Sequence, residues 1–302
     1  MQLLRWAGAL ALAVTCGPTA IAAPKGFDGK LAFNYTREVV EFGERVPGSA
    51  AHKRLEEFIL RRLKLAGARV ESDRFTADTP RGPLPMHNII AKLGPATGRI
   101  TMVAGHYDTK FLPHFVGAND GGASTGMLLA LADTLGRDAD LHSPVWLLFL
   151  DGEEAVKNWT DADSVYGSRH LVQHFVQTGL APQIRAVLLV DMIGDRDLDI
   201  ARETNSTRWV QDFIASAAQQ LGYGKYFFQQ ETAISDDHIP FLHAGIPAVD
   251  LGDFTYGPMG PRYDSMGKYH HSPEDTMDKL SAHSFTVVGA VVLRTIELLG
   301  RQ

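Results

Sequence analysis

The chain has 302 residues, of which 45% are hydrophobic and 21% are charged, and its formal net charge is −6 at pH 7. This composition predicts a globular protein, and the length allows one large core or two small ones. An acidic balance without a basic run argues against nucleic acid as a partner. Cys16 is the only cysteine, so removal of the first segment would exclude disulfides and thiolate metal sites.

The first segment has the features of a secretory signal peptide. One positive charge, Arg5, precedes an apolar run at 6–14, and the small residues at 20–22 mark a cleavage site. The run is too short to span a bilayer comfortably. We therefore expect residues 1–22 to be a cleaved signal peptide. Residues 23–302 are expected to form one domain, secreted or periplasmic, monomeric and without a membrane partner.

Apolar residues recur along the chain with two periods, one typical of helices and one typical of strands. Helical spacing predicts helices over residues 33–42, 52–65, 121–135, 168–177, 207–221, 236–244 and 283–299. Apolar or alternating runs predict strands over residues 69–76, 87–93, 100–104, 145–150, 186–190 and 246–251. Residues 79–85, which include three prolines, and the glycine-rich residues 252–268 are expected to be loops.

Strands alternate with helices in this order, and several strands are apolar throughout. That pattern is typical of a largely parallel sheet with helices on both faces. No internal repeat or linker divides the chain. The predicted fold class is α/β, and the predicted architecture is a single-domain three-layer αβα sandwich with a mixed, largely parallel central sheet.

The predicted strand 145–150 is followed by three acidic residues within four positions: Asp151, Glu153 and Glu154. A carboxylate removed from water must be paired or must coordinate a metal. Two adjacent glutamates can also divide two tasks, one binding a cation and the other transferring protons. For such a pair taken alone, the simpler alternative is an acidic loop at a helix N-terminus.

Other predicted strands also end in residues that can bind metal ions. Their ends and the following loops offer nitrogen and oxygen ligands: His106, Asp108, Asp120, Asp191, Asp236, Asp237, His238, His270 and His271. Ligands of open α/β sheets bind beyond the carboxyl ends of the strands. Histidine and carboxylate without sulfur are typical of catalytic zinc, whereas magnesium or calcium would leave the histidines unused. The sequence therefore predicts a metal enzyme, with zinc as the metal.

These motifs resemble the zinc-dependent exopeptidases of peptidase family M28 and, within that family, the glutaminyl cyclases. Gly-His-Tyr-Asp at 105–108 and Phe-Val-Gly-Ala-Asn-Asp at 115–120 match both branches in part. The insertion 155–166, which contains Trp159, is similar to the cyclase pattern, and so is Asp-Asp-His-Ile-Pro-Phe-Leu at 236–242. The resemblance covers most of the chain and implies a zinc-exopeptidase-like catalytic domain.

The resemblance implies a glutaminyl-peptide cyclotransferase. Its reaction would be zinc-dependent cyclisation of N-terminal glutaminyl residues of peptides or proteins to pyroglutamate, with release of ammonia. One zinc ion per chain would be held by Asp120, Glu154 and His271. Glu153 would be the general acid and base, because one carboxylate can accept a proton from the amine and return it to the leaving group.

The resemblance also implies which residues surround the substrate. Asp191 and Asp236 would form a hydrogen-bonded acidic pair with catalytic roles, and Trp159 would line the glutaminyl pocket. Two positions depart from the family pattern. The cyclases carry a tryptophan where this chain has His270, and often a histidine where it has Asp250. Both residues are expected at the pocket wall as substrate-binding residues, and His270 also competes as a zinc ligand.

The alternative is an aminopeptidase of the same family with two zinc ions. His106 and Asp191 would then bind a second zinc, Asp120 would bridge the two ions, and Glu153 would activate a water. All the ligand types are present, so the ligands alone do not choose between the two enzymes. With one zinc, His106 and Asp108 would instead orient the site. A non-catalytic binding protein on the same fold is a third reading, which the intact Glu153 disfavours.

Overall fold

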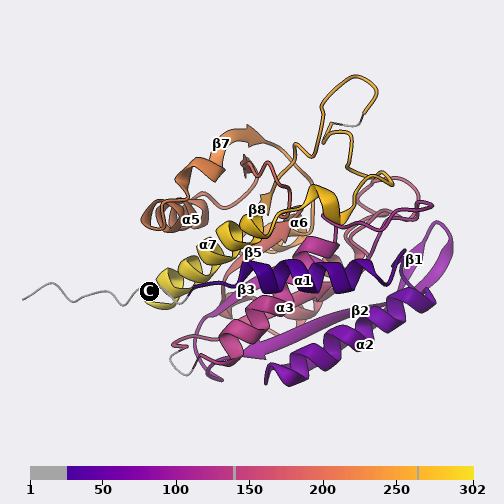
Figure 1. The fold of residues 1–302 in the computed structure, drawn as a ribbon. Coiled ribbons are helices and arrows are strands. Elements are labelled where there is room, and N and C mark those ends of the chain that lie inside the picture. Colours follow the sequence, from indigo (N-terminus) through magenta and orange to yellow (C-terminus); the bar gives the residue numbers. More distant parts are fainter. Residues whose placement is uncertain (1–25, 139–140, 264) are drawn as a thin grey trace, which may run out of the picture.

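The computed structural model describes residues 26–138, 141–263 and 265–302. The predicted signal peptide, residues 1–22, lies outside these described residues. A central sheet with helices on both faces forms the body of the protein, as Figure 1 shows. The predicted α/β class and the three-layer arrangement are confirmed.

The central sheet has the strand order β1-β2-β4-β3-β5-β8. Its strands are β1 (Arg69–Thr79), β2 (Gly82–Leu93), β3 (Ile100–His106), β4 (Val145–Leu150), β5 (Ile184–Asp191) and β8 (Ala248–Gly252). Strands β4, β3, β5 and β8 are parallel to one another, whereas β2 is antiparallel to β1 and to β4. The sheet is therefore mixed and largely parallel, as predicted.

Two groups of helices cover the two faces. The first group is α1 (Gly29–Val40), α2 (Ala50–Leu65), α3 (Gly122–Gly136), α5 (Arg208–Gln220) and α7 (Ala282–Gly300), and the second is α4 (Tyr166–Gln177) and α6 (His238–His243). In β4, Leu147 and Phe149 belong to the core beneath the first group, and Leu148 and Leu150 to the core beneath the second. Both faces of this strand are buried, which explains its continuous apolar run.

Helix α7 is long and apolar enough to cross a membrane by length and composition, but 67% of that apolar window is buried inside the fold. Its neighbours in Figure 1 are α1 and α5, and residues such as Val288 and Val292 belong to the main core. This burial is that of a core helix.

The loop predicted over residues 79–85 is wrong, because β1 and β2 form one long antiparallel hairpin through this stretch. Prolines suggest a loop since they cannot donate a ladder hydrogen bond. In β2, the N–H of His87 points away from β1 and donates to Asp151 Oδ2 at 2.7 Å. Pro83 and Pro85 lie four and two residues before His87 in β2, so their backbone nitrogens point to the same side of the strand as that of His87. Their nitrogens therefore face the outer edge of the hairpin, where no bond to β1 is lost.

A second, two-stranded parallel sheet was not predicted. It consists of β6 (Ile200–Glu203) and β7 (Phe227–Thr232). Strand β7 has the sequence Phe-Phe-Gln-Gln-Glu-Thr and is half-buried or exposed after its first residue. Strand β7 therefore lacks the apolar alternation on which the prediction depended, and β6 has only four residues, which is too short to show a period.

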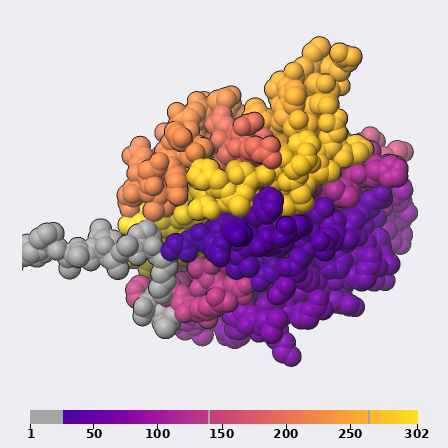
Figure 2. Space-filling view, viewed as in Figure 1, coloured from indigo at the N-terminus to yellow at the C-terminus, as the bar shows by residue number. Residues whose placement is uncertain are grey.

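The carboxyl ends of β3, β4 and β5 meet at one edge of the sheet because these strands are parallel. The long segment 253–268 follows β8 at the same edge. Asp253, Phe254 and Tyr256 are buried in the body, and the middle of the segment projects from it as the orange protrusion in Figure 2. This segment has neither helix nor strand among its described residues, as predicted.

Candidate active site and metal centre

A cavity of about 560 Å³ lies beyond the carboxyl ends of the parallel strands. That volume is typical of small-molecule sites. Seven predicted site residues line it: Asp120, Glu153, Trp159, Asp191, Asp236, His270 and His271. Glu154 is buried beside it. Further lining residues are Lys110, Lys157, Asn158, Met192, Ala233, Ile234, Ser235, Phe254 and Met266. The structure thus brings together residues that are up to 151 positions apart, from Asp120 to His271.

Asp120 lies between β3 and α3, where a buried carboxylate holds its backbone. Asp275 accepts hydrogen bonds from the N–H groups of Asn119 at 2.8 Å and Asp120 at 3.1 Å. The Tyr256 hydroxyl donates to the same carboxylate at 2.7 Å. Burial and the charge of Asp120 raise the pKa of Asp275 to about 7, although these hydrogen bonds oppose the shift. Asp275 therefore fixes the segment that presents Asp120.

The turn after β4 presents the two glutamates. Gly152 has a φ of +70°, and a Cβ there would lie 2.5 Å from a neighbouring sulfur atom, so a glycine is required. Asp108 accepts the N–H groups of Glu153 at 3.2 Å and Glu154 at 3.4 Å. Lys110 donates to Glu154 Oε2 at 2.9 Å. Because Oε2 is engaged in this way, Oε1 is the atom of Glu154 that faces the site.

The three predicted zinc ligands converge. His271 Nε2 lies 3.1 Å from Glu154 Oε1 and 3.4 Å from Asp120 Oδ2. Both oxygens are buried and lack a hydrogen-bond partner among the described residues. Bare buried carboxylate oxygens cost free energy unless a cation or a donor meets them. One imidazole nitrogen and two carboxylate oxygens are ligands that zinc accepts, so these residues fit a zinc ion.

The backbone of His271 supports a functional role. Its φ is +46°, a left-handed conformation that costs a non-glycine residue about 1–3 kcal/mol and is concentrated at functional sites. The ring of His270 stacks on it, with centroids 3.6 Å apart. Ligand atoms of His270, His271 and Asp120 lie within 4.8 Å of one another, so His270 is also close enough to bind the same metal ion. The two carboxylate oxygens that lack a hydrogen-bond partner among the described residues both lie within 3.4 Å of His271 Nε2.

A second group of potential ligands surrounds His106. Its Nε2 lies 3.2 Å from Asp120 Oδ1 and 3.2 Å from Asp191 Oδ1. Its Nδ1 lies 3.4 Å from Asp108 Oδ1. Asp120 therefore turns one oxygen toward His106 and the other toward His271. This is the arrangement that the two-zinc alternative requires, with Asp120 between the two positions.

The carboxylate of Glu153 lies among other acids. Burial raises its pKa well above the usual range, and the charge of Asp236 adds to the shift while His106 opposes it. Burial and the charge of Asp191 likewise raise the pKa of Asp236, to about 6. A glutamate with a raised pKa can hold and return a proton near neutral pH. A raised pKa is the direction expected of a carboxyl group that serves as general acid and base.

Asp250 lies outside the lining of the cavity. It is fully buried on β8, where its carboxylate lies 3.6 Å from His238 Nδ1. His238 Nε2 in turn lies 3.1 Å from Glu203. Burial and the charge of Asp236 raise the pKa of Asp250 well above the usual range. This geometry places Asp250 behind the acids of the pocket, where it can act on them through charge.

The insertion 155–166 is folded by a single carboxylate. Asp163 accepts the N–H groups of Val156 at 2.9 Å, Lys157 at 3.0 Å and Asn158 at 2.9 Å. The chain then returns to its starting point, because the N–H of residue 165 donates to the carbonyl oxygen of residue 153 at 2.8 Å. Trp159 belongs to this insertion, lines the cavity and is 40% exposed.

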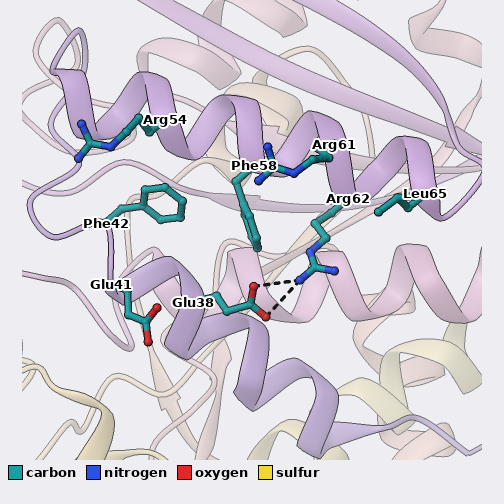
Figure 3. Close-up of a pocket in the computed structure, with 8 residues that line it drawn as sticks. All are labelled: Glu38, Glu41, Phe42, Arg54, Phe58, Arg61, Arg62 and Leu65. Atoms are coloured by element: carbon teal, nitrogen blue, oxygen red, sulfur yellow. Dashed lines mark hydrogen bonds and ion pairs between the residues drawn. The ribbon is translucent and has the colours of Figure 1, made fainter.

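Another cavity, of about 480 Å³, lies between α1 and α2 (Figure 3). Arg62 donates to both carboxylate oxygens of Glu38, at 2.9 and 3.3 Å, and Phe42 and Phe58 contribute apolar surface. None of the predicted site residues lies there. We therefore assign the chemistry to the cavity at the strand ends.

A buried charged network lies beneath the turn that carries Glu153. His52 Nε2 on α2 lies 2.8 Å from Asp151 Oδ1, and His52 Nδ1 lies 3.2 Å from Glu56. His87 Nδ1 on β2 lies 2.7 Å from the same glutamate. The network therefore joins α2 and β2 to the end of β4, two residues before Glu153.

This network predicts a pH-dependent contribution to stability. Burial lowers the pKa of His52, but the charge of Asp151 and hydrogen bonds to Asp151 and Glu56 raise it to about 10. A raised folded-state pKa gives stability that is complete below the unfolded value of about 6.5 and is lost as pH rises through about 10. His52→Gln should therefore lower the free energy of unfolding by about 3–5 kcal/mol at pH 6. The loss should be smaller at pH 9.5.

Urea unfolding at the two pH values would measure this difference. His174→Gln, the same change on the exposed face of α4, is the control and should show no such trend. An equal loss at both pH values in His52→Gln would contradict a charged His52.

Comparison with known proteins agrees with this geometry. Residues 88–296 match the pattern described as "Peptidase family M28". A mouse "Glutaminyl-peptide cyclotransferase-like protein" is 37% identical in an alignment 240 positions long, which covers 68% of this chain and 62% of the mouse protein. A crystal structure of a glutaminyl cyclase from an Acidobacteriales bacterium has a TM-score of 0.89 and 40% identity. The match covers 95% of this chain and 99% of that one.

The chain belongs to the glutaminyl cyclase group of peptidase family M28. A Zn-dependent exopeptidase from Parabacteroides distasonis is also similar in structure, with a TM-score of 0.78 and 26% identity over 91% of this chain and 99% of that one. The resemblance drawn from the motifs is thereby confirmed, as is a zinc-exopeptidase-like fold. The chain matches less than two thirds of the length of the mouse relative.

The sequence patterns did not predict the contacts that three further residues make in this site. Lys110 pairs with Glu154 and follows the Gly-His-Tyr-Asp motif by two residues, so its position in that motif was a usable signal. Asp275 follows His271 by four residues, but its contact with Asn119 spans 156 positions. Asp237 accepts a hydrogen bond from the Ser168 hydroxyl of α4, and no local pattern indicates that contact.

Proposed function

We propose that this protein is a zinc-dependent glutaminyl cyclase, which converts N-terminal glutaminyl residues of peptides or proteins to pyroglutamate and releases ammonia. One observation carries the proposal. The insertion 155–166 builds a wall of the cavity and places Trp159 there together with the buried Glu153 and the converging His271. The glutaminyl cyclases among the similar proteins support the same activity.

We propose one zinc ion per chain, held by Asp120, Glu154 and His271. The support is the pair of bare, buried oxygens that face His271 Nε2. A zinc ion bound there would polarise the γ-carbonyl group of the substrate as a Lewis acid.

The side chains of the protein would perform the proton transfers. The α-amine of the substrate attacks its own γ-carbonyl carbon, so that a new C–N bond closes the ring. Glu153 accepts the proton released by the amine and delivers it to the γ-amide nitrogen. The old C–N bond breaks and ammonia leaves, without consumption of water. Asp191 and Asp236 would accept hydrogen bonds from the substrate, and their position in the lining of the cavity supports this role.

The glutaminyl side chain must fold back on its own amine before reaction. Trp159 offers an apolar face for its methylene groups, and a ring 40% exposed in the free protein has surface to bury. Holding the two reacting groups together can supply up to about 7–11 kcal/mol of the barrier reduction in well-oriented systems. His270, stacked on His271, would complete this wall.

A two-zinc aminopeptidase is the second candidate. The observation in its favour is the group of His106, Asp120 and Asp191, whose ligand atoms lie within 4.8 Å of one another. In that enzyme Glu153 would activate a water for peptide hydrolysis.

Mass spectrometry of two peptides would test the proposal, one beginning with glutamine and one beginning with leucine. We expect loss of ammonia from the first peptide and no change in the second. Release of free amino acids from either peptide would instead establish an aminopeptidase. Zinc measured per chain in the same preparation should be one, whereas a value of two would favour the alternative.

We also propose that the mature chain acts outside the cytoplasm as a monomer. The charge, apolar run and cleavage motif within residues 1–22 support export. N-terminal sequencing of protein from the native host should begin at residue 23 or 24, and size-exclusion chromatography should give the mass of one chain. An intact first segment would contradict the signal peptide.

A further inference from the structure

Arg45 is a fully buried arginine between α1 and α2, outside every motif used so far. Its guanidinium makes four hydrogen bonds to backbone carbonyl oxygens. Nε donates to Tyr107 at 3.2 Å, and Nη1 donates to Gly43 at 3.2 Å and to Val116 at 2.5 Å. Nη2 donates to Gly117 at 3.0 Å. Four of the five N–H donors of the fork are therefore used on backbone.

Three of the four carbonyl acceptors, those of Tyr107, Val116 and Gly117, belong to the two loops that build the metal centre, whereas Gly43 lies on the same connection as Arg45. Tyr107 directly precedes Asp108, whose carboxylate holds the backbone of both glutamates. Gly117 precedes Asp120 by three residues, and its carbonyl also accepts the N–H of Gly122 in the first turn of α3 at 3.1 Å. Arg45 therefore links two segments. One carries Asp120, a proposed zinc ligand, and the other carries Asp108, whose carboxylate holds the backbone of Glu154.

These segments leave little freedom to move. Gly117 has a φ of +48°, and a Cβ there would lie 2.3 Å from the carbonyl oxygen of Asp120 and 3.4 Å from Arg45 Nη2. The N–H of Arg45 donates to Thr109 Oγ1 at 2.8 Å, and the Thr109 N–H donates back to the Arg45 carbonyl at 3.3 Å. A shift of the guanidinium would therefore be transmitted directly to the Asp120 segment.

Charge offers a reason for burying a cation here. Burial lowers the pKa of Arg45 to about 10, while the charges of Asp275, Asp120 and Asp108 oppose the shift. The group stays protonated at neutral pH. A charge removed from water must be compensated, and these three acids supply the compensation without a direct ion pair to Arg45 among the described residues.

We propose that Arg45 is a positioning residue for zinc, which sets the affinity of the metal site by holding the backbone of the Asp120 and Asp108 segments. The inference rests on the proposed zinc site. Lysine cannot replace Arg45, because a single ammonium group cannot reach four carbonyl oxygens arranged around a planar fork.

The test is the zinc dissociation constant of full-length mature protein, measured by competition with a chromophoric chelator. Arg45→Lys should weaken zinc binding at least tenfold, in the range found when partners that orient metal ligands are removed. Arg294→Lys is the matched control. Arg294 is also buried, but it lies on α7 with Gln220 and Glu297 as partners. This control should lower the melting temperature and keep zinc affinity within twofold of the wild type.

An affinity of Arg45→Lys within twofold of the wild type would overturn the proposal, whatever its melting temperature. If Arg45→Lys does not fold, Thr109→Val provides the second variant, because it removes the acceptor of the Arg45 N–H and keeps the side-chain volume. It should weaken zinc binding several-fold, and unchanged affinity would count against the role.

Turnover of the glutamine-first peptide separates this inference from the proposed function. A wild type that binds zinc but does not cyclise the peptide would refute the activity, and the ratio of dissociation constants would still decide the role of Arg45. A wild type that binds no zinc would refute both.

Discussion

Glutamine in place of Glu153 should leave the protein folded and loaded with zinc but lower kcat for a glutamine-first peptide by about 10²–10⁴-fold. The amide keeps the size of the side chain and removes its capacity to accept and return a proton. The carboxylate is buried beside Asp236 and His106, and its raised pKa suits that exchange. The measurements are steady-state turnover, zinc content and circular dichroism on the same preparation.

Glu57→Gln is the control for this variant, since it makes the same change on the exposed surface of α2. It should have the turnover of the wild type. Near-normal turnover by Glu153→Gln with zinc retained would remove Glu153 from the mechanism.

His271→Ala should release zinc, whereas His270→Ala should retain it. The nitrogen Nε2 of His271 lies 3.1 Å from Glu154 Oε1 and 3.4 Å from Asp120 Oδ2, and both oxygens lack a hydrogen-bond partner among the described residues. Loss of a ligand should weaken zinc binding by more than the roughly 10–100-fold typical of an orienting partner. Metal content after dialysis, with chelator competition for the affinity, would measure the effect.

Each of the two variants is the control for the other, because both lose the same imidazole atoms and the two rings stack on each other. His270→Ala should instead weaken substrate binding, seen as a raised KM, because His270 lines the cavity. The opposite pattern, with zinc lost only from His270→Ala, would assign the ligand to His270.

The strand ends were predictable because their signals are local. In β4 an apolar run buried on both faces is followed at once by Asp151, Glu153 and Glu154, and parallel neighbours bring such ends together. The chemistry of the ligands follows from residue type alone, since histidine and carboxylate without cysteine favour zinc. The family motifs then gave each residue a role that composition could not supply.

The errors also have physical causes. Pro83 and Pro85 are compatible with a strand because their nitrogens face an edge without a hydrogen-bonding partner, and the sequence does not show which edge is free. Strand β7 is polar because little of it is buried. Both cases depend on which neighbour a strand finds, and pairing between distant segments leaves no period in the sequence.

The sequence by itself determined the α/β class, the residues at the carboxyl ends of the strands and the histidine and carboxylate side chains that are offered there. Only the tertiary structure decided which oxygen of Asp120 faces His271 and which faces His106, that Lys110 occupies one oxygen of Glu154, and that Arg45 supports the loops beneath. The reason is that periodicity and residue type are local properties. Convergence depends on contacts such as that of Asp275 with Asn119, 156 positions apart, which form only when the whole core packs.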